Sequence, residues 1–193
     1  MGKAYANKKK IANRPKGDFY STPKSLIWVA EDIIITEFNK DIPLLEPCYG
    51  VGAISEELEK LGFKVIKNDL YQGGIDYLTS DFKETQIITN PPFSLWDAFV
   101  NKAKEHTSKF MFIGRLNYLG THSRNTSKIW EGLKHIYCFD RYVDYQTPYR
   151  EDGNFHVGAM ATAWFLWEEG YTDPSQLSIL DVQKYATLGN FKC

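Results

Sequence analysis

The sequence predicts an α/β fold, in which helices cover both faces of a mainly parallel β-sheet. The first observation is that short strand-like runs and amphipathic helix-like segments alternate along the chain. Such alternation links neighbouring strands through helical crossovers, which place helices on both faces of the sheet. The second observation is that the Pro-Pro and Gly-x-Gly sequences directly follow strand-like runs. Parallel sheets bind ligands at the carboxyl ends of their strands, so these residues predict one common site.

Four segments have the apolar spacing of amphipathic helices. The segment AISEELEKL places Ile54, Leu58 and Leu61 on one face, and the earliest segment begins at Pro23, a residue suited to a first helical turn. In chain order, the expected helices are residues 23–38, 53–61, 95–106 and 123–133.

Six apolar runs predict strands, and the first three stop at residues that interrupt a strand. The first stops at Pro47, the second at Asn68-Asp69, and the third just before two consecutive prolines. In chain order, the expected strands are residues 42–46, 63–67, 86–89, 109–114, 135–139 and 160–167.

The length of 193 residues fits one domain, given about 150 residues per domain as a prior. Hydrophobic residues make up 43% of the chain and charged residues 24%, which argues against wholesale disorder. We expect a basic flexible arm over residues 1–17, the main domain over residues 18–170, and a tail over residues 171–193. The tail would pack on the domain, extend it or mediate self-association, so a homodimer is an arrangement that the sequence leaves open.

Neither a membrane span nor a disulfide framework is expected. No run approaches the ~18 apolar residues that a membrane helix needs, and the basic first residues lack the apolar core of a secretory signal. The cysteines, Cys48, Cys138 and Cys193, are odd in number and widely spaced, and the histidines lack metal-ligand spacing. We therefore expect a cytoplasmic protein without a bound metal.

Charge is distributed unevenly along the chain. Residues 1–17 carry six basic side chains and no acidic one, which leaves 17 basic and 24 acidic residues for the rest. A basic arm on an acidic body favours contact with phosphate groups, although a solvated terminus has the same composition. The arm residues expected to bind nucleic acid are Lys8, Lys9, Lys10 and Arg14.

The most specific feature is Asn90-Pro91-Pro92-Phe93, which directly follows an apolar run. From average residue usage, Asn-Pro-Pro followed by an aromatic residue arises by chance at on the order of one in 10⁵ positions. The exocyclic amine of a nucleobase is a poor nucleophile, because its lone pair is delocalised into the ring. The Asn90 oxygen and the Pro91 carbonyl, held by the fixed φ angles of the prolines, can accept hydrogen bonds from that amine. Phe93 can stack on an extruded base.

A second feature, Glu46-Pro47-Cys48-Tyr49-Gly50-Val51-Gly52, joins a predicted strand to a predicted helix. Gly50 and Gly52 allow the backbone to approach a ligand closely, and the helix N-terminus favours an anionic group. The third glycine of the dinucleotide-binding fingerprint is absent. Asp69 closes the next strand, at a position where a carboxylate can bind the hydroxyls of a ribose.

Together these features resemble those of S-adenosylmethionine-dependent amino-methyltransferases, and most closely the DNA N6-adenine methyltransferases of bacteria and their phages. Asn-Pro-Pro-Phe is similar to the catalytic motif of that family, and Asp69 is similar to its ribose-binding acid. The segment from Glu46 to Gly52 is similar to its first cofactor motif. The resemblance covers about residues 18–168. It implies a Rossmann-like, seven-stranded methyltransferase sheet and a location in the cytoplasm of a bacterium or of a phage-infected host cell.

The resemblance also implies the roles of individual residues. The segment GIDYL resembles the motif that recognises the cofactor adenine, with Asp76 on its amino group, and the segment FYSTP resembles the motif that closes over the methionine end. The implied catalytic residues are Asn90, Pro91, Pro92 and Phe93. The implied residues binding S-adenosylmethionine are Tyr20, Thr22, Glu46, Cys48, Gly50, Gly52, Asp69, Asp76 and Tyr77.

The implied substrate is DNA, with RNA as an alternative. Only 20 residues separate Asp69 from Asn90, so that gap cannot hold a target-recognition domain. Two loops, after the fourth and fifth predicted strands, mix cations, amides and aromatics that suit phosphate contacts and stacking, although ordinary polar loops have a similar composition. The residues expected there to bind nucleic acid are Arg115, Asn117, Tyr118, Arg124 and Arg141.

Other activities fit parts of the pattern. RNA adenine-N6 and cytosine-N4 methyltransferases, and enzymes that methylate a protein glutamine, have similar motifs, and Asn90 favours adenine over cytosine. A cytosine-C5 enzyme needs a cysteine beside its catalytic proline, whereas the Pro47-Cys48 pair lies in the cofactor turn. A nicotinamide oxidoreductase, or a nucleic-acid-binding module that keeps the fold without catalysis, would leave the two prolines without a role.

Overall fold

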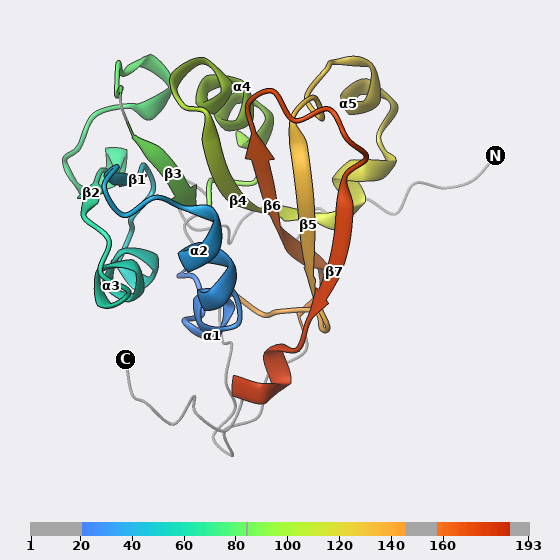
Figure 1. The fold of residues 1–193 in the computed structure, drawn as a ribbon, viewed down its shortest axis with the longest axis horizontal. Coiled ribbons are helices and arrows are strands. Elements are labelled where there is room, and N and C mark those ends of the chain that lie inside the picture. Colours follow the sequence, from blue (N-terminus) through green and yellow to red (C-terminus); the bar gives the residue numbers. More distant parts are fainter. Residues whose placement is uncertain (1–20, 84, 146–157, 186–193) are drawn as a thin grey trace, which may run out of the picture.

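The computed structural model describes residues 21–83, 85–145 and 158–185, and its seven strands form one sheet. The strands are β1 (Leu44–Glu46), β2 (Val65–Lys67), β3 (Gln86–Thr89), β4 (Lys109–Arg115), β5 (Leu133–Phe139), β6 (Thr162–Glu168) and β7 (Gln176–Leu180). Their order across the sheet is β2-β1-β3-β4-β6-β5-β7 (Figure 1). Strand β6 runs antiparallel to β4 and β5, and the other neighbouring strands are parallel. The predicted α/β fold with a mainly parallel, seven-stranded sheet is therefore confirmed.

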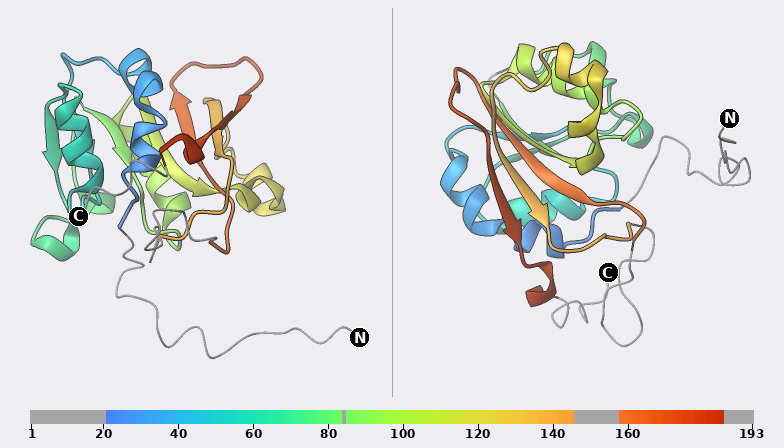
Figure 2. Two further views of the ribbon diagram at one scale, coloured as in Figure 1. Left: turned by 90° about the horizontal axis from the view of Figure 1, so that it is seen from below. Right: turned by 90° about the vertical axis from the view of Figure 1, so that its right-hand side faces the viewer.

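Helices cover the two faces of this sheet (Figure 2). The α-helices are α1 (Ser25–Trp28), α2 (Glu31–Glu37), α3 (Ala53–Lys60), α4 (Trp96–His106) and α5 (His122–Thr126). The 3₁₀ turns are η3 (Leu70–Gln72), η4 (Tyr77–Thr79), η5 (Leu116–Gly120) and η6 (Val182–Tyr185). Helices α1, α2 and α3 pack in one apolar cluster and α4 packs in a second one.

The strand residues divide between these two clusters. In β1, Leu44 belongs to the cluster of α1–α3, and Leu45 belongs to the cluster of α4. In β3, Ile88 and Ile87 divide in the same way. Because successive side chains of a strand point to opposite faces, the alternation shows that both faces of the sheet are buried.

Two predicted helices differ from the observed ones. The segment 23–38 is interrupted at Ala30, whose φ of −104° and ψ of 6° separate α1 from α2. The segment 123–133 is helical only in α5. Beyond it, Lys128 has a left-handed φ of 58°, and the carbonyls of Lys128 and Ile129 accept hydrogen bonds from Lys104 Nζ. These hydrogen bonds satisfy the two carbonyl groups, so the chain needs no further helical turn there.

Strand β7 lies within the segment that was treated as a tail. It pairs in parallel with β5, from His135 opposite Gln176 to Phe139 opposite Leu180. Leu177 and Ile179 are 60% and 63% exposed, because β7 is an edge strand and none of the described helices covers that face. The sequence therefore lacks the buried apolar run by which the other six strands were predicted.

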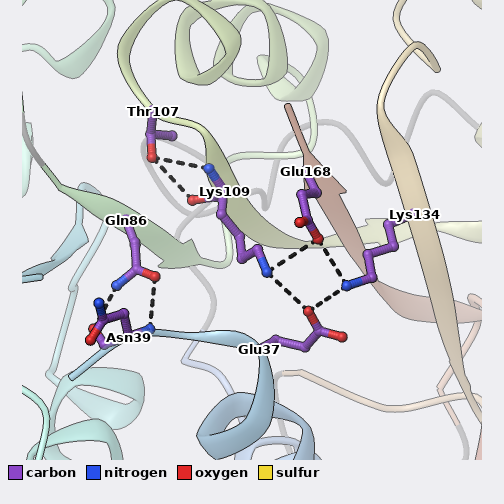
Figure 3. A network of polar contacts seen from close by, with 7 residues as sticks. All are labelled: Glu37, Asn39, Gln86, Thr107, Lys109, Lys134 and Glu168. Carbon is purple, nitrogen blue, oxygen red and sulfur yellow. Dashed lines mark hydrogen bonds and ion pairs between the residues drawn. The ribbon is translucent and has the colours of Figure 1, made fainter. Parts of the chain in front are cut away.

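A polar network fixes the amino-terminal edge of the parallel strands (Figure 3). Glu37 at the end of α2 accepts hydrogen bonds from Lys109 Nζ at 3.1 Å and from Lys134 Nζ at 2.8 Å. Glu168 of β6 contacts the same two lysines at 3.2 and 2.8 Å. The carboxylates of Glu37 and Glu168 therefore each contact β4 and β5 at the amino-terminal edge of the sheet. The opposite, carboxyl-terminal edge is left for a ligand site.

Two further properties concern the residues that the structure describes. None of the helices there is both long and apolar enough to cross a membrane. The same part of the chain holds no group of three or more His, Cys, Asp or Glu side chains arranged to hold a metal ion.

Candidate active site

A cavity of about 440 Å³ lies at the carboxyl ends of β1, β2 and β3. The chain passes from β1 to β2 on one side and then to β3 on the other, and open α/β sheets bind ligands at such a reversal of strand order. The volume lies in the range of roughly 300–1,000 Å³ that is typical of small-molecule sites. The sequence-predicted residues that line the cavity are Thr22, Glu46, Cys48, Gly50, Asp69, Asp76, Tyr77, Asn90, Pro91, Pro92 and Phe93.

Asp69 joins two of the loops around the cavity. Its Oδ2 accepts a hydrogen bond from the Gly50 amide at 3.0 Å, and its Oδ1 accepts one from the Tyr71 amide at 2.8 Å. The side chain is buried, but a carboxylate has about four lone-pair sites, so each oxygen can accept a further bond. Asp69 can therefore shape the glycine turn and bind ligand hydroxyls at the same time.

Glu46 is a buried carboxyl group at the end of β1. It is 1% exposed and accepts a hydrogen bond from the Ser55 hydroxyl of α3. Burial, partly offset by that hydrogen bond, raises the pKa of Glu46 to about 8. A cationic group bound in the cavity would stabilise the ionised form, so Glu46 suits the positively charged end of a ligand.

The loop after β2 is held by Asn68, which the sequence analysis treated only as a strand end. The Asn68 side chain donates to the Ile75 carbonyl at 2.9 Å and accepts from the Ile75 amide at 3.0 Å. A Cβ atom on Gly74 would lie 2.6 Å from Asn68 Oδ1, so the close approach requires glycine. The contact places Asp76 at the start of η4, where it accepts a hydrogen bond from the Leu78 amide at 3.0 Å.

Tyr77 brings a polar group into an otherwise apolar wall. The side chain is 2% exposed, packs against the Phe99 ring at 5.1 Å, and lines the cavity. Its hydroxyl is buried and has no hydrogen-bond partner among the described residues. Because a buried unpaired hydroxyl is costly, this atom indicates a ligand group that would complete the site.

Asn90 is oriented by Thr22, which precedes α1. The Asn90 Nδ2 group donates a hydrogen bond to the Thr22 hydroxyl at 3.1 Å. This contact uses the donor side of the amide and leaves the Asn90 oxygen free to accept. Next to it, the Pro91 carbonyl has no hydrogen-bond donor in the described part of the chain, whereas the Pro92 carbonyl accepts from the Leu95 amide at 2.9 Å. Two acceptors are therefore available at the cavity.

Phe93 is fixed by three residues from other elements. Its carbonyl accepts a hydrogen bond from the Tyr118 hydroxyl at 3.1 Å. Its ring meets the Tyr145 ring edge-on at 6.1 Å, and the Arg115 guanidinium lies over it at 4.7 Å from the centroid. An aromatic ring held in this way is a preorganised surface for stacking.

The glycine turn places two further predicted residues. Gly52 caps α3 with a left-handed φ of 85°, a conformation that favours glycine, and it does not line the cavity. Cys48 does line it, and burial raises the pKa of its thiol above the ordinary value. A thiol that stays protonated is a weak nucleophile, which agrees with the argument against cytosine-C5 chemistry.

The fold is shared with solved structures. A candidate class I S-adenosylmethionine-dependent methyltransferase from Listeria monocytogenes matches with a TM-score of 0.57 and 13% identity, over 88% of this chain and 69% of that one. A candidate RNA methyltransferase from Pyrococcus horikoshii matches with a TM-score of 0.58 and 17% identity, over 84% and 98%. The chain has the class I methyltransferase fold. The modification subunit of a candidate type I restriction enzyme from Vibrio vulnificus matches with a TM-score of 0.51 and 13% identity, over 90% of this chain and 49% of that one.

Because these identities are low, the similarity to the solved structures shows the shared class I methyltransferase fold and nothing more. No family model matches the sequence. No curated protein sequence matches it either.

The residues predicted to bind nucleic acid are only partly at the surface. Asn117 is exposed. Tyr118, in contrast, is buried against Trp96, and Arg124 lies over its ring and pairs with Asp97 at 2.7 Å. Arg141 is half-buried and pairs with Asp140 at 3.4 Å. Tyr20 and the arm residues Lys8, Lys9, Lys10 and Arg14 lie outside the described residues.

Burial of Glu46 predicts a pH dependence of stability in the ligand-free protein. Its pKa is raised from the ordinary 4.5 to about 8, so the folded protein keeps a proton that the unfolded chain has lost. The free energy of unfolding should therefore fall as pH rises between these values, by up to about 1.4 kcal/mol per pH unit. Glu46→Gln should lack this component, as chemical denaturation across that pH range would measure. Parallel pH profiles of the two proteins would contradict the raised pKa.

Proposed function

We propose that this chain transfers a methyl group from S-adenosylmethionine to the N6 amine of adenine in DNA. The observation that carries the proposal is that Asn90-Pro91-Pro92-Phe93 lines the same cavity as Glu46, Asp69 and Asp76. Methyl transfer needs the acceptor amine beside the cofactor. This cavity places the motif expected to bind the amine next to the residues expected to bind the cofactor. The class I methyltransferase fold supports the methyl-transfer part of this proposal.

The residues of the cavity fit S-adenosylmethionine. Asp69 has lone pairs for the ribose hydroxyls, Asp76 suits the adenine amino group, and Glu46 suits the cationic methionine end. The unpaired Tyr77 hydroxyl adds a polar partner in the wall. The cofactor would supply an electrophilic methyl group, because its sulfur carries a positive charge.

The chain's own residues would activate the acceptor. The Asn90 oxygen and the Pro91 carbonyl accept hydrogen bonds from the two N–H bonds of the amine, which draws the nitrogen lone pair out of conjugation with the ring. The N–C bond would form as the S–C bond of the cofactor breaks, and the methylated nitrogen would then lose one proton to water. Positive charge develops on that nitrogen during transfer, so fixed acceptors stabilise the transition state more than the ground state. Phe93 stacks on the base after it leaves the helical stack.

Thr22 should act as a positioning residue for Asn90. Thr22→Val removes the hydroxyl that accepts a hydrogen bond from the Asn90 amide group, so the Asn90 side chain becomes free to rotate. We expect kcat to fall roughly tenfold, which corresponds to the loss of about one hydrogen bond. Thr22→Ser keeps the hydroxyl and should retain most activity. Equal kcat values for the serine and valine variants would contradict this role.

Nucleoside mass spectrometry tests the proposed product. Unmethylated DNA and RNA are incubated separately with the protein and S-adenosylmethionine, digested, and compared with reactions that lack protein. The proposal predicts N6-methyladenine in DNA. N4-methylcytosine, or N6-methyladenine in RNA alone, would overturn the substrate, and no modified nucleoside in either would count against nucleic acid as the acceptor.

A further inference from the structure

Arg115, the last residue of β4, lies against the proposed catalytic motif. Its guanidinium carbon is 4.7 Å from the centroid of the Phe93 ring, a geometry in which cation and ring attract each other. The side chain is half-buried. One face of the Phe93 ring is therefore covered by Arg115, and Phe93 also lines the cavity.

The Arg115 guanidinium has donors but no hydrogen-bond acceptor among the described residues. Its Nε atom is buried without a hydrogen-bond partner, and Arg115 forms no ion pair with a described residue. The other two arginines of these loops differ, because Arg124 pairs with Asp97 and Arg141 pairs with Asp140.

The residue opposite Arg115 does not satisfy it either. Arg115 pairs in register with Thr162 of β6, whose hydroxyl already accepts a hydrogen bond from Tyr145 at 2.9 Å. A planar guanidinium with several free N–H groups is suited to a phosphate, which it can bind through two parallel hydrogen bonds.

We propose that Arg115 holds Phe93 by one ring face and binds the phosphate of the nucleotide whose base enters the cavity. This inference rests on the proposed function and names a contact to its substrate. One side chain would then couple the position of the nucleotide backbone to the surface on which the base stacks.

Two substitutions separate the two roles. Arg115→Met keeps an unbranched apolar chain over Phe93 but removes the charge. Arg115→Lys keeps the charge but removes the planar group that stacks. Lys64→Met is the matched control, because Lys64 is an exposed cation just before β2, at the opposite edge of the sheet.

The readouts are binding of a fluorescein-labelled, mixed-sequence oligodeoxynucleotide over a range of salt concentrations, and kcat for methyl transfer to the same DNA. We expect Arg115→Met to lower affinity roughly tenfold at low salt and to reduce the slope of log affinity against log salt by about one. Arg115→Lys should keep the slope and lower kcat roughly fivefold. Both variants should keep the cofactor affinity and melting temperature of the wild type.

Four results would overturn this inference. They are an unchanged salt slope in Arg115→Met, an equal change in Lys64→Met, a loss of cofactor affinity or of folding in both Arg115 variants, and no binding of the probe by the wild type. A wild type that binds the probe with the predicted differences, but transfers no methyl group, would instead overturn the proposed function and retain the phosphate contact.

Discussion

Replacing Asn90 with alanine should remove most methyl transfer and leave cofactor binding nearly intact. The Asn90 oxygen is one of the two acceptors that the cavity offers to the target amine, and Thr22 holds its orientation. Removing one preorganised polar group that stabilises transition-state charge costs roughly 10²- to 10³-fold in kcat. Single-turnover kinetics would measure the rate, and calorimetry would measure the affinity for the cofactor.

The matched control for this variant is Asn101→Ala. Asn101 is an exposed residue of α4, so its loss should change neither the rate nor the cofactor affinity. Turnover that survives in Asn90→Ala would remove this motif from the catalytic role. A parallel loss of rate and cofactor affinity would show that Asn90 supports the fold of the cavity.

Replacing Asp69 with alanine should weaken cofactor binding by roughly a hundredfold. Two backbone amides, those of Gly50 and Tyr71, would lose their charged acceptor, and the ribose contact would be lost with them. Hydrogen bonds to charged groups each contribute about 1.5–3 kcal/mol, and about 2.7 kcal/mol corresponds to a hundredfold. Calorimetric titration with the cofactor measures the effect directly.

A graded series makes this prediction sharper. Asp69→Asn keeps one acceptor oxygen but turns an NH₂ group toward a backbone N–H, so its affinity should lie between those of the wild type and the alanine variant. Asp81→Ala is the control, because the Asp81 side chain is 74% exposed and pairs only with Lys83 among the described residues. An affinity in Asp69→Ala that matches the control would exclude the ribose role.

The elements that could be predicted are those whose burial leaves a pattern in the sequence. The six apolar runs became strands because helices cover both faces of most of the sheet, so most of the side chains in these runs are apolar. Strand β7 is held by backbone pairing to β5 and exposes Leu177, so it shows no such pattern. The break at Ala30 was equally hidden, because buried positions continue across it with helical spacing.

The residues of the candidate site also divide into those that leave a pattern in the sequence and those that do not. Asp69, Asn90 and the glycine turn could be located because they occupy strand ends, where topology alone brings them together. Two residues that position other parts of the site, Asn68 and Ser55, were not predicted. The Asn68 contact to Ile75 and the Ser55 contact to Glu46 depend on how a loop or a helix packs, which no local pattern records. Gly74 was the one sequence signal for the Asn68 contact, since a glycine in the loop after a strand-end Asn-Asp indicates that the backbone closely approaches another residue.

Methyl transfer from radiolabelled S-adenosylmethionine to DNA, by the wild type and by the Asn90→Ala and Asn101→Ala variants, tests whether the Asn-Pro-Pro-Phe motif methylates DNA. We expect label in DNA with the wild type and the Asn101 variant, and little label with the Asn90 variant, while all three bind the cofactor. Duplex DNA, single-stranded DNA, RNA and protein would be compared as acceptors in parallel. No label in any acceptor, or equal label from the Asn90 variant, would contradict the proposed function.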